Sequence, residues 1–208
     1  RSDELAREAT ELTTKNSLTS KLSNLSLKLY GKMLKTGYVK NEKEHKQVTS
    51  FFEQELPKYD WDVMGFREKL WLYKTYLWYA FTVQDFLSCY KYSKKWVDLF
   101  HDNRTMIAFN PVFYIRGNHY LMESLYLIRN TSKLEQSLSD FEEAITSDKF
   151  PKNDNIEVLS FLYLYNNKLN LHFLKGNFEE GICSVNEIID GIHKYKDRLD
   201  NHHIMVLY

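Results

Sequence analysis

The stretch Leu171-His-Phe-Leu-Lys-Gly-Asn-Phe-Glu-Glu-Gly-Ile182, continued to Ile189, joins two helical patterns through a turn of two residues. Gly176 is predicted to end the first helix, because glycine adopts the left-handed conformation without steric cost. Asn177, with Glu180 three residues later, predicts the N-cap of the second helix. The stretch therefore predicts two helices that meet in a tight antiparallel hairpin.

The second of these helices carries one apolar stripe. Steps of four and three separate its members, which are Phe178, Ile182, Val185, Ile189 and Ile192. Similar helical spacing runs through most of the chain, which has only 7 glycines and 3 prolines among 208 residues. Alternation typical of strands is not found. We therefore predict an all-α fold.

Capping residues and apolar spacing place the other helices. Residues 3–15 show a weak helical pattern, and a stronger one that starts near Leu18 ends near Gly37. Asn41 with Glu44 predicts the start of a helix that Pro57 closes. Further helices are predicted over residues 63–82, 85–100, 110–130, 154–176 and 177–195. The pair Ser132/Glu135 predicts the start of one more helix between residues 130 and 154, and the pair Asp154/Glu157 predicts the start of the helix over 154–176.

Three of the predicted second helices share one register. Phe86, Leu134 and Phe178 become equivalent at spacings of 48 and 44 residues, and we expect all three to be buried. Three positions further on each helix has a small residue, and four positions on a large apolar one. We therefore predict one α-solenoid over residues 1–208, with degenerate helices in 1–60, three hairpins in 63–195, and the start of a further truncated repeat in 200–208.

The residues of the last two hairpins resemble a known family. Residues 176–182 look like the turn and second-helix start of a tetratricopeptide repeat, and the next-to-last hairpin matches its large-small-large pattern at Leu134, Ser137, Leu138, Phe141, Ala144 and Ile145. The resemblance implies antiparallel helical hairpins stacked as an α-solenoid whose concave face is lined by the first helices. The repeats are longer than the family's 34 residues.

Composition and charge argue against several classes of partner. Lys plus Arg equal Asp plus Glu at 28 each, so no net field attracts nucleic acid or an anionic membrane. No apolar run approaches the roughly 20 residues of a membrane span. Cys89 and Cys183 both fall in predicted helices, which predicts reduced, buried thiols in a cytoplasmic protein.

Signs of catalysis or metal binding are scarce. The chain has no glycine-rich phosphate loop, no His-Glu-x-x-His and no Gly-x-Ser-x-Gly. His193, His202 and His203 lie near Cys183 in sequence, but their spacing matches no zinc site, and we expect no metal and no cofactor. Only His119 with Glu123, one turn apart, offers a seed for acid–base chemistry. We therefore predict that the chain is not an enzyme.

One polar face recurs on the first helices of the three hairpins. Its members lie at i, i+3, i+7 and i+10 of each helix, which is one side. Two interpretations stay open: the face packs against the preceding repeat or water, or it forms a groove that binds a peptide or a helix. The twelve residues are Glu68, Trp71, Thr75 and Trp78; Arg116, His119, Glu123 and Tyr126; and Ser160, Tyr163, Asn167 and Asn170.

The leading functional prediction is a non-enzymatic scaffold that binds another protein or peptide in this groove. The alternative is a ligand- or peptide-sensing regulatory domain of a larger protein that uses the same groove. Ile204 and Leu207 extend the apolar pattern beyond the last hairpin. Without a following helix they would be uncovered, which predicts fraying or self-association at this C-terminal edge.

A first prediction concerns the small residue Gly181. Replacing it by leucine is expected to destabilise the fold by about 1–3 kcal/mol, because a side chain there overpacks a close helix contact. Glu180→Ala, at a surface position, is expected to change stability by less than about 0.5 kcal/mol. Thermal melts of both variants check this, and equal melting temperatures would contradict it.

Overall fold

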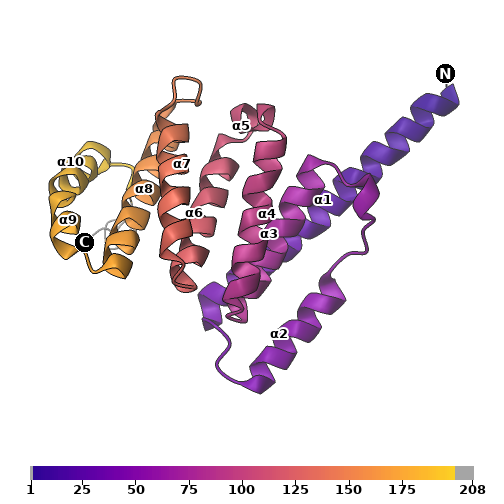
Figure 1. Ribbon diagram of the computed structural model, residues 1–208. Coiled ribbons are helices and arrows are strands. Elements are labelled where there is room, and N and C mark those ends of the chain that lie inside the picture. Colours follow the sequence, from indigo (N-terminus) through magenta and orange to yellow (C-terminus); the bar gives the residue numbers. More distant parts are fainter. Residues whose placement is uncertain (1, 200–208) are drawn as a thin grey trace. The chain divides into compact units, whose positions relative to one another are not determined.

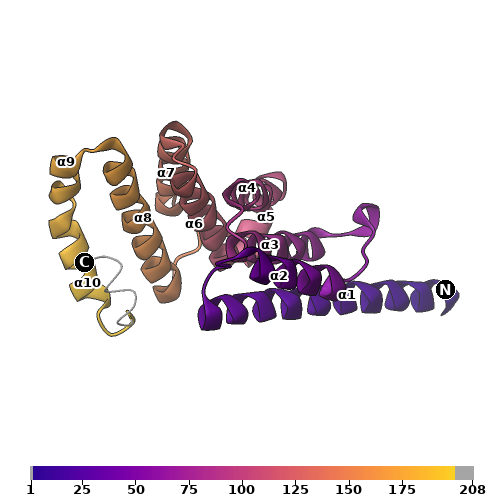
Figure 2. The same cartoon turned by 90° about the horizontal axis from the view of Figure 1, so that it is seen from below.

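The computed structural model describes residues 2–199, with side chains described from Thr10 onward. Every regular element in this range is a helix (Figures 1 and 2), which confirms the all-α prediction. The helices form two compact units, Arg1–Leu99 and Phe100–Tyr208, which we describe separately. The predicted truncated repeat in 200–208, with Ile204, Leu207, His202 and His203, lies outside the described residues.

The first unit is built from α1 (Ser2–Thr36), α2 (Glu42–Glu55), the short 3-10 helix η1 (Trp61–Val63), α3 (Phe66–Thr82) and most of α4 (Phe86–Asp102). The two patterns predicted before Gly37 form the single helix α1, which ends at that glycine with φ of 72°. The predicted cap of α2 is confirmed. Asn41 accepts the backbone N–H of Glu44 at 2.9 Å, and the Glu44 carboxylate accepts the N–H of Lys40 at 2.9 Å.

Helix α1 packs along α3 and buries one face of it. Leu22 of α1 contacts Leu72 of α3 and Met64 in a shared apolar cluster. The Thr75 hydroxyl donates to the carbonyl of Leu22 at 3.0 Å, and that of Thr19 donates to the Glu68 carboxylate at 3.1 Å. Because α3 is apolar nearly all round, it needs such cover on more than one side.

The second unit contains α5 (Thr105–Phe109), α6 (Pro111–Leu127), α7 (Thr131–Thr146), α8 (Asp154–Lys175), α9 (Phe178–Cys183) and α10 (Val185–Tyr195). Helix α7 packs against both α6 and α8, and α6 also contacts α8 directly. Pro111 begins α6 as predicted, but Asn110 makes no side-chain cap bond there. The five-residue helix α5 was not predicted, since it carries no periodic pattern of useful length.

The caps of α7 and α8 lie one or two residues earlier than predicted. Asn130, not Ser132, caps α7 by accepting a backbone N–H at 3.2 Å. Asn153, not Asp154, caps α8 in the same way at 3.0 Å. In both places an asparagine directly precedes the helix. Asparagine and aspartate cap about equally well, so residue type alone did not choose between neighbours.

The predicted turn at Gly176 is confirmed, but the prediction for the helix that follows it is partly wrong. Gly176 has φ of 71°, and the next N–H reaches back to the carbonyl of His172 at 3.0 Å. Asn177 makes no cap bond; its side-chain amide donates to the Glu180 carboxylate at 3.2 Å. The helix predicted over residues 177–195 is interrupted at Ser184, between α9 and α10.

The expectation that Phe86, Leu134 and Phe178 are all buried is wrong. Leu134 is 0% exposed and Phe86 is half-buried, but Phe178 is 61% exposed. Helix α7 has α6 and α8 against it, whereas α9 and α10 pack on α8 and on each other. Gly181 and Ile188 are the buried residues of these two helices, and the predicted stripe is largely exposed, at Phe178, Ile182, Val185 and Ile189.

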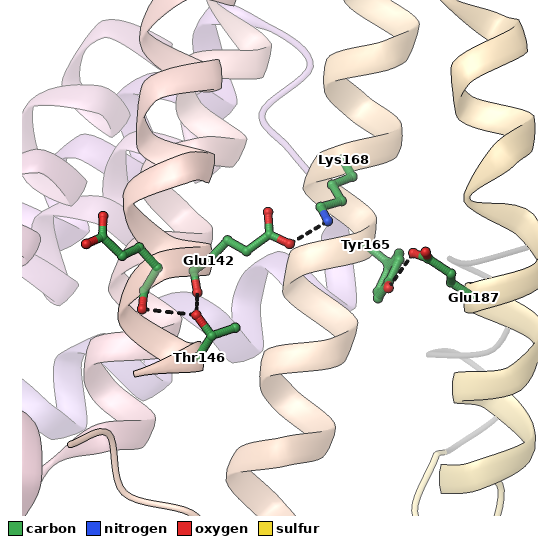
Figure 3. A network of polar contacts seen from close by, with 6 residues as sticks. Glu142, Thr146, Tyr165, Lys168 and Glu187 are labelled. Carbon is green, nitrogen blue, oxygen red and sulfur yellow. Dashed lines mark hydrogen bonds and ion pairs between the residues drawn. The ribbon is translucent and has the colours of Figure 1, made fainter. Parts of the chain in front are cut away.

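Polar contacts tie α8 to the helices on both sides of it. Figure 3 shows Lys168 of α8 meeting Glu142 of α7, with 2.7 Å between Nζ and Oε1. On the other side the hydroxyl of Tyr165 donates to the Glu187 carboxylate of α10 at 2.8 Å. These groups remain partly open to water, so each contact contributes modestly to stability.

Among the described glycines, Gly191 leaves the least room for a side chain, and the sequence did not single it out. A Cβ added there would lie 2.0 Å from the ring of Phe161 on α8. At Gly181, where the sequence predicted a close helix contact, the added Cβ would lie 3.5 Å from the Cβ of His172, which is an ordinary contact, so the prediction of a close approach there is wrong. A glycine at position 191 is therefore what lets α10 lie against α8.

We expect Gly191→Ala to destabilise the protein by about 1–3 kcal/mol, because the Phe161 ring must move to admit a methyl group. That ring is tilted against Tyr165 and Tyr195, at centroid distances of 5.1 and 5.4 Å, so its movement disturbs both contacts. The matched control is Gly31→Ala in α1, where no atom lies within 4 Å.

The control should raise stability by roughly 0.5–1 kcal/mol, since alanine favours the helix more than glycine does. Urea unfolding followed by circular dichroism measures both changes. Stabilisation by both substitutions would contradict the close approach at Gly191.

Candidate functional site

The part of the predicted face that lies on α3 is not open. Glu68 is 6%, Thr75 0% and Trp78 8% exposed, because α1 covers them in the first unit. Trp71 is half-buried and packs against the cluster that contains Leu22. The polar pattern on α3 therefore reflects contacts with α1, and this part of the groove prediction is corrected.

On α6 and α8 the structure brings the predicted residues together. The imidazole of His119 stacks on the ring of Tyr163, with centroids 4.0 Å apart and planes 3° from parallel. The side-chain amide of Asn167 donates to the carbonyl of Tyr163 at 2.6 Å and lies 3.3 Å from Nδ1 of His119. His119 lies on α6, and Tyr163 and Asn167 are four residues apart on one side of α8. These contacts therefore join one turn of α6 to one turn of α8.

The hydrogen bond from Asn167 sets the state of His119. Because Nδ2 of Asn167 is a donor, Nδ1 of the imidazole accepts, and the ring proton of the neutral form lies on Nε2. That nitrogen points toward Glu123, whose Oε2 is 3.8 Å away. A separation of 3.8 Å is too long for a hydrogen bond. We call His119, Glu123, Tyr163 and Asn167 the polar cluster.

Burial shifts the two titratable groups of the polar cluster in opposite directions. Burial, with a smaller effect from the Arg116 charge, lowers the pKa of His119 to about 4. Burial alone raises the pKa of Glu123 to about 7, although its side chain is 37% exposed. The imidazole of His119 is therefore neutral at neutral pH. The carboxyl group of Glu123, which is partly exposed to water, changes its charge near that pH.

One atom of the polar cluster has no partner. Asn167 is 0% exposed, and its Oδ1 accepts no hydrogen bond from the described residues. Buried polar atoms are nearly always paired, because leaving one unpaired costs about 1–3 kcal/mol. Oδ1 of Asn167 therefore lacks the hydrogen-bond donor that a buried amide oxygen ordinarily has.

The other four predicted residues of α6 and α8 lie around the polar cluster. Arg116 is exposed, and Tyr126 is half-buried with its ring 6.5 Å from that of Phe173. Asn170 is half-buried. Ser160 lines a surface depression of about 460 Å³ and has a buried hydroxyl with no partner among the described residues.

The structure also places the two cysteines and the residue types that could bind a metal. Cys89 is buried as predicted, but Cys183 is exposed, so the prediction of a buried thiol is wrong for Cys183. Within residues 2–199 no group of three or more His, Cys, Asp or Glu side chains is arranged to hold a metal.

Comparison with known proteins gives no relative. No protein-family model, no curated protein and no solved structure matches this chain. Among the helices of the described residues, none combines the length and apolar character needed to cross a bilayer. The site therefore has to be interpreted from its own chemistry.

The polar cluster suits recognition by hydrogen bonds and charge. It presents a partly exposed carboxyl group whose charge changes near neutral pH, next to a neutral imidazole that stacks on an aromatic ring. Such groups discriminate between ligands because a mismatched ligand leaves them unpaired.

The raised pKa of Glu123 predicts how Glu123→Gln changes stability with pH. The folded pKa of about 7 exceeds the ordinary 4.5, so the folded state binds the proton more tightly than the unfolded state does. The Glu123 contribution to stability is therefore full below about 4.5 and is lost as pH rises toward 7. The lowered pKa of His119 changes stability with pH in the opposite direction. His119 is present in both the wild type and the variant.

We therefore expect the stability of Glu123→Gln relative to the wild type to increase as pH rises from about 4.5 to about 7, and then to level off. Urea midpoints at several pH values measure the difference. Glu143→Gln, at an exposed position of α7, is the control for removing one charge. A pH-independent difference for Glu123→Gln would contradict the buried carboxyl group.

Proposed function

We propose that this chain is a non-enzymatic protein-interaction module that acts in the cytoplasm. In this proposal the helices α6 to α10 are consecutive hairpins of a tetratricopeptide-like solenoid. The face of α6 and α8 that carries the polar cluster binds an extended peptide or a helix of a partner protein. We call this surface the α6–α8 face.

The observation that carries the proposal is the partly exposed carboxyl group of Glu123 beside the stacked rings of His119 and Tyr163, which join two first helices. The contact of α6 with α8, each also packed against α7, is the pairing that a stack of hairpins requires, and it supports the solenoid arrangement. The two free cysteines support a reducing compartment.

The α6–α8 face also has the mixture of groups that peptide recognition uses. Arg116 is exposed and Glu123 is partly exposed, one on each side of His119 along α6. Tyr126 and Asn170 add an aromatic ring and an amide that are half-buried. Amides and charged groups bind a peptide backbone, while aromatic rings pack on its side chains.

Selection of a random peptide display library on the whole 208-residue protein tests the proposal. The double variant Arg116→Ala/Asn170→Ala removes two side chains at the outer part of the α6–α8 face. We expect the selected peptides to bind this variant about tenfold more weakly or worse, as measured by calorimetry.

The control is Ser139→Ala/Glu143→Ala on the exposed side of α7, which should bind the selected peptides as the wild type does. Melting curves confirm that both double variants are folded. Enrichment of no peptide, or equal binding by both double variants, would contradict the proposal. In the alternative of a sensing domain, the same peptides would also change the activity of an attached module.

A further inference from the structure

The partly buried carboxylate of Glu123 has no cationic partner within the described residues. Nε2 of His119 lies 3.8 Å from it, and the hydrogen bond from Asn167 to the other ring nitrogen favours the neutral form of that imidazole. Arg116 is exposed and forms no ion pair with Glu123. A carboxylate that is partly removed from water and unpaired is unfavourable until a cation joins it.

Aromatic rings lie on both sides of this carboxylate along the helix. The stacked pair of His119 and Tyr163 lies one turn before Glu123. Tyr126, three residues after it on the same side of α6, is tilted against Phe173 of α8, which is 61% exposed. A carboxylate between aromatic rings favours an ammonium or guanidinium group, because ring faces attract cations and also pack on an aliphatic stem.

We propose that Glu123, between the pairs His119/Tyr163 and Tyr126/Phe173, is a subsite for the lysine or arginine side chain of a partner peptide. Asn167 is a positioning residue: it holds the imidazole so that a neutral N–H, and no positive charge, faces the bound cation. This inference rests on the proposed binding function of the α6–α8 face and specifies the charge of its ligand.

A metal ion fits this subsite less well than an organic cation. The carboxylate and the imidazole supply two ligand atoms, and a protein-bound divalent metal usually takes three or more from the protein. The surrounding rings add mainly apolar surface, and the neutral phenol oxygens of Tyr126 and Tyr163 are weaker metal ligands than a carboxylate. An alkylammonium group uses that surface, whereas a hydrated metal ion would not.

The charge of Glu123 makes the binding depend on pH. From α6 the neighbours of the Glu123 carboxyl group are the neutral His119 and the positive charge of Arg116, and from α8 they are the uncharged Tyr163 and Asn167. Helices α5 and α7 also pack on α6, and among the described residues no charged side chain of either forms an ion pair with Glu123. Because burial raises the pKa of Glu123 to about 7, the carboxylate form is complete only above that pH. Cation binding should therefore weaken as pH falls through about 7.

The direct test uses n-butylammonium chloride as the probe and the intact protein. Carbon-13 labelling reports the Glu123 carboxyl resonance, which is assigned by its loss in Glu123→Gln. At pH 8 we expect saturable shifts of the Glu123 and His119 resonances with butylammonium, and none with n-butanol or with sodium chloride at the same concentration. We also expect the Glu123→Gln variant to lose the saturable shift of His119.

The matched control is Glu143→Gln on α7, which should bind butylammonium as the wild type does. Equal binding of n-butanol would show that only apolar contact is involved and would overturn the subsite. Binding that persists in Glu123→Gln, or the absence of any saturable shift, would also overturn it.

The display selection separates this inference from the proposed function. If selected peptides are rich in Lys or Arg and bind Glu123→Gln about tenfold more weakly, both hold. If peptides bind the α6–α8 face without basic residues, the binding function stands and the cation subsite fails. If no peptide is selected, the proposed function fails, and the butylammonium titration decides the subsite alone.

Discussion

The structure depends on covering helices that are apolar on more than one side. The helices α3, α6 and α8 each bury residues around most of their circumference. Each of them therefore needs other helices packed on more than one side. In the first unit α1 supplies that neighbour for α3. In the second unit α7 and α8 supply it for α6, and α7, α9 and α10 supply it for α8. Polar residues on these helices therefore become buried and must find partners.

Most of these buried polar groups are satisfied within their own helix. Asn118 donates to the carbonyl four residues earlier at 2.9 Å, and Ser124 does the same at 2.7 Å. Asn167 differs, because its amide nitrogen is used between two helices while its oxygen stays unpaired. The polar cluster is distinguished from ordinary packing by this one atom and by the carboxyl group beside it, and not by its overall polarity.

The exposed stripe on α9 and α10 shows how strongly burial depends on neighbours. Leu134 on α7 is fully buried, and Phe178, its equivalent in sequence, is largely exposed. The apolar spacing is the same in both helices, but α7 has a helix on each side and α9 has one on a single side among the described residues. Spacing predicts which side of a helix is apolar, whereas the number of neighbours decides how much of that side is buried.

The sequence by itself determined the helical class, the turn at Gly176 and the cap at Asn41, because these follow from local backbone preferences and side-chain spacing. It also placed His119, Glu123, Tyr163 and Asn167 on one predicted face. Only the tertiary structure decided that α1 covers Thr75 and Trp78, that Gly191 meets Phe161, and that the helix after Asn177 breaks at Ser184. Those outcomes depend on contacts between segments far apart in the chain, whose geometry no local pattern contains.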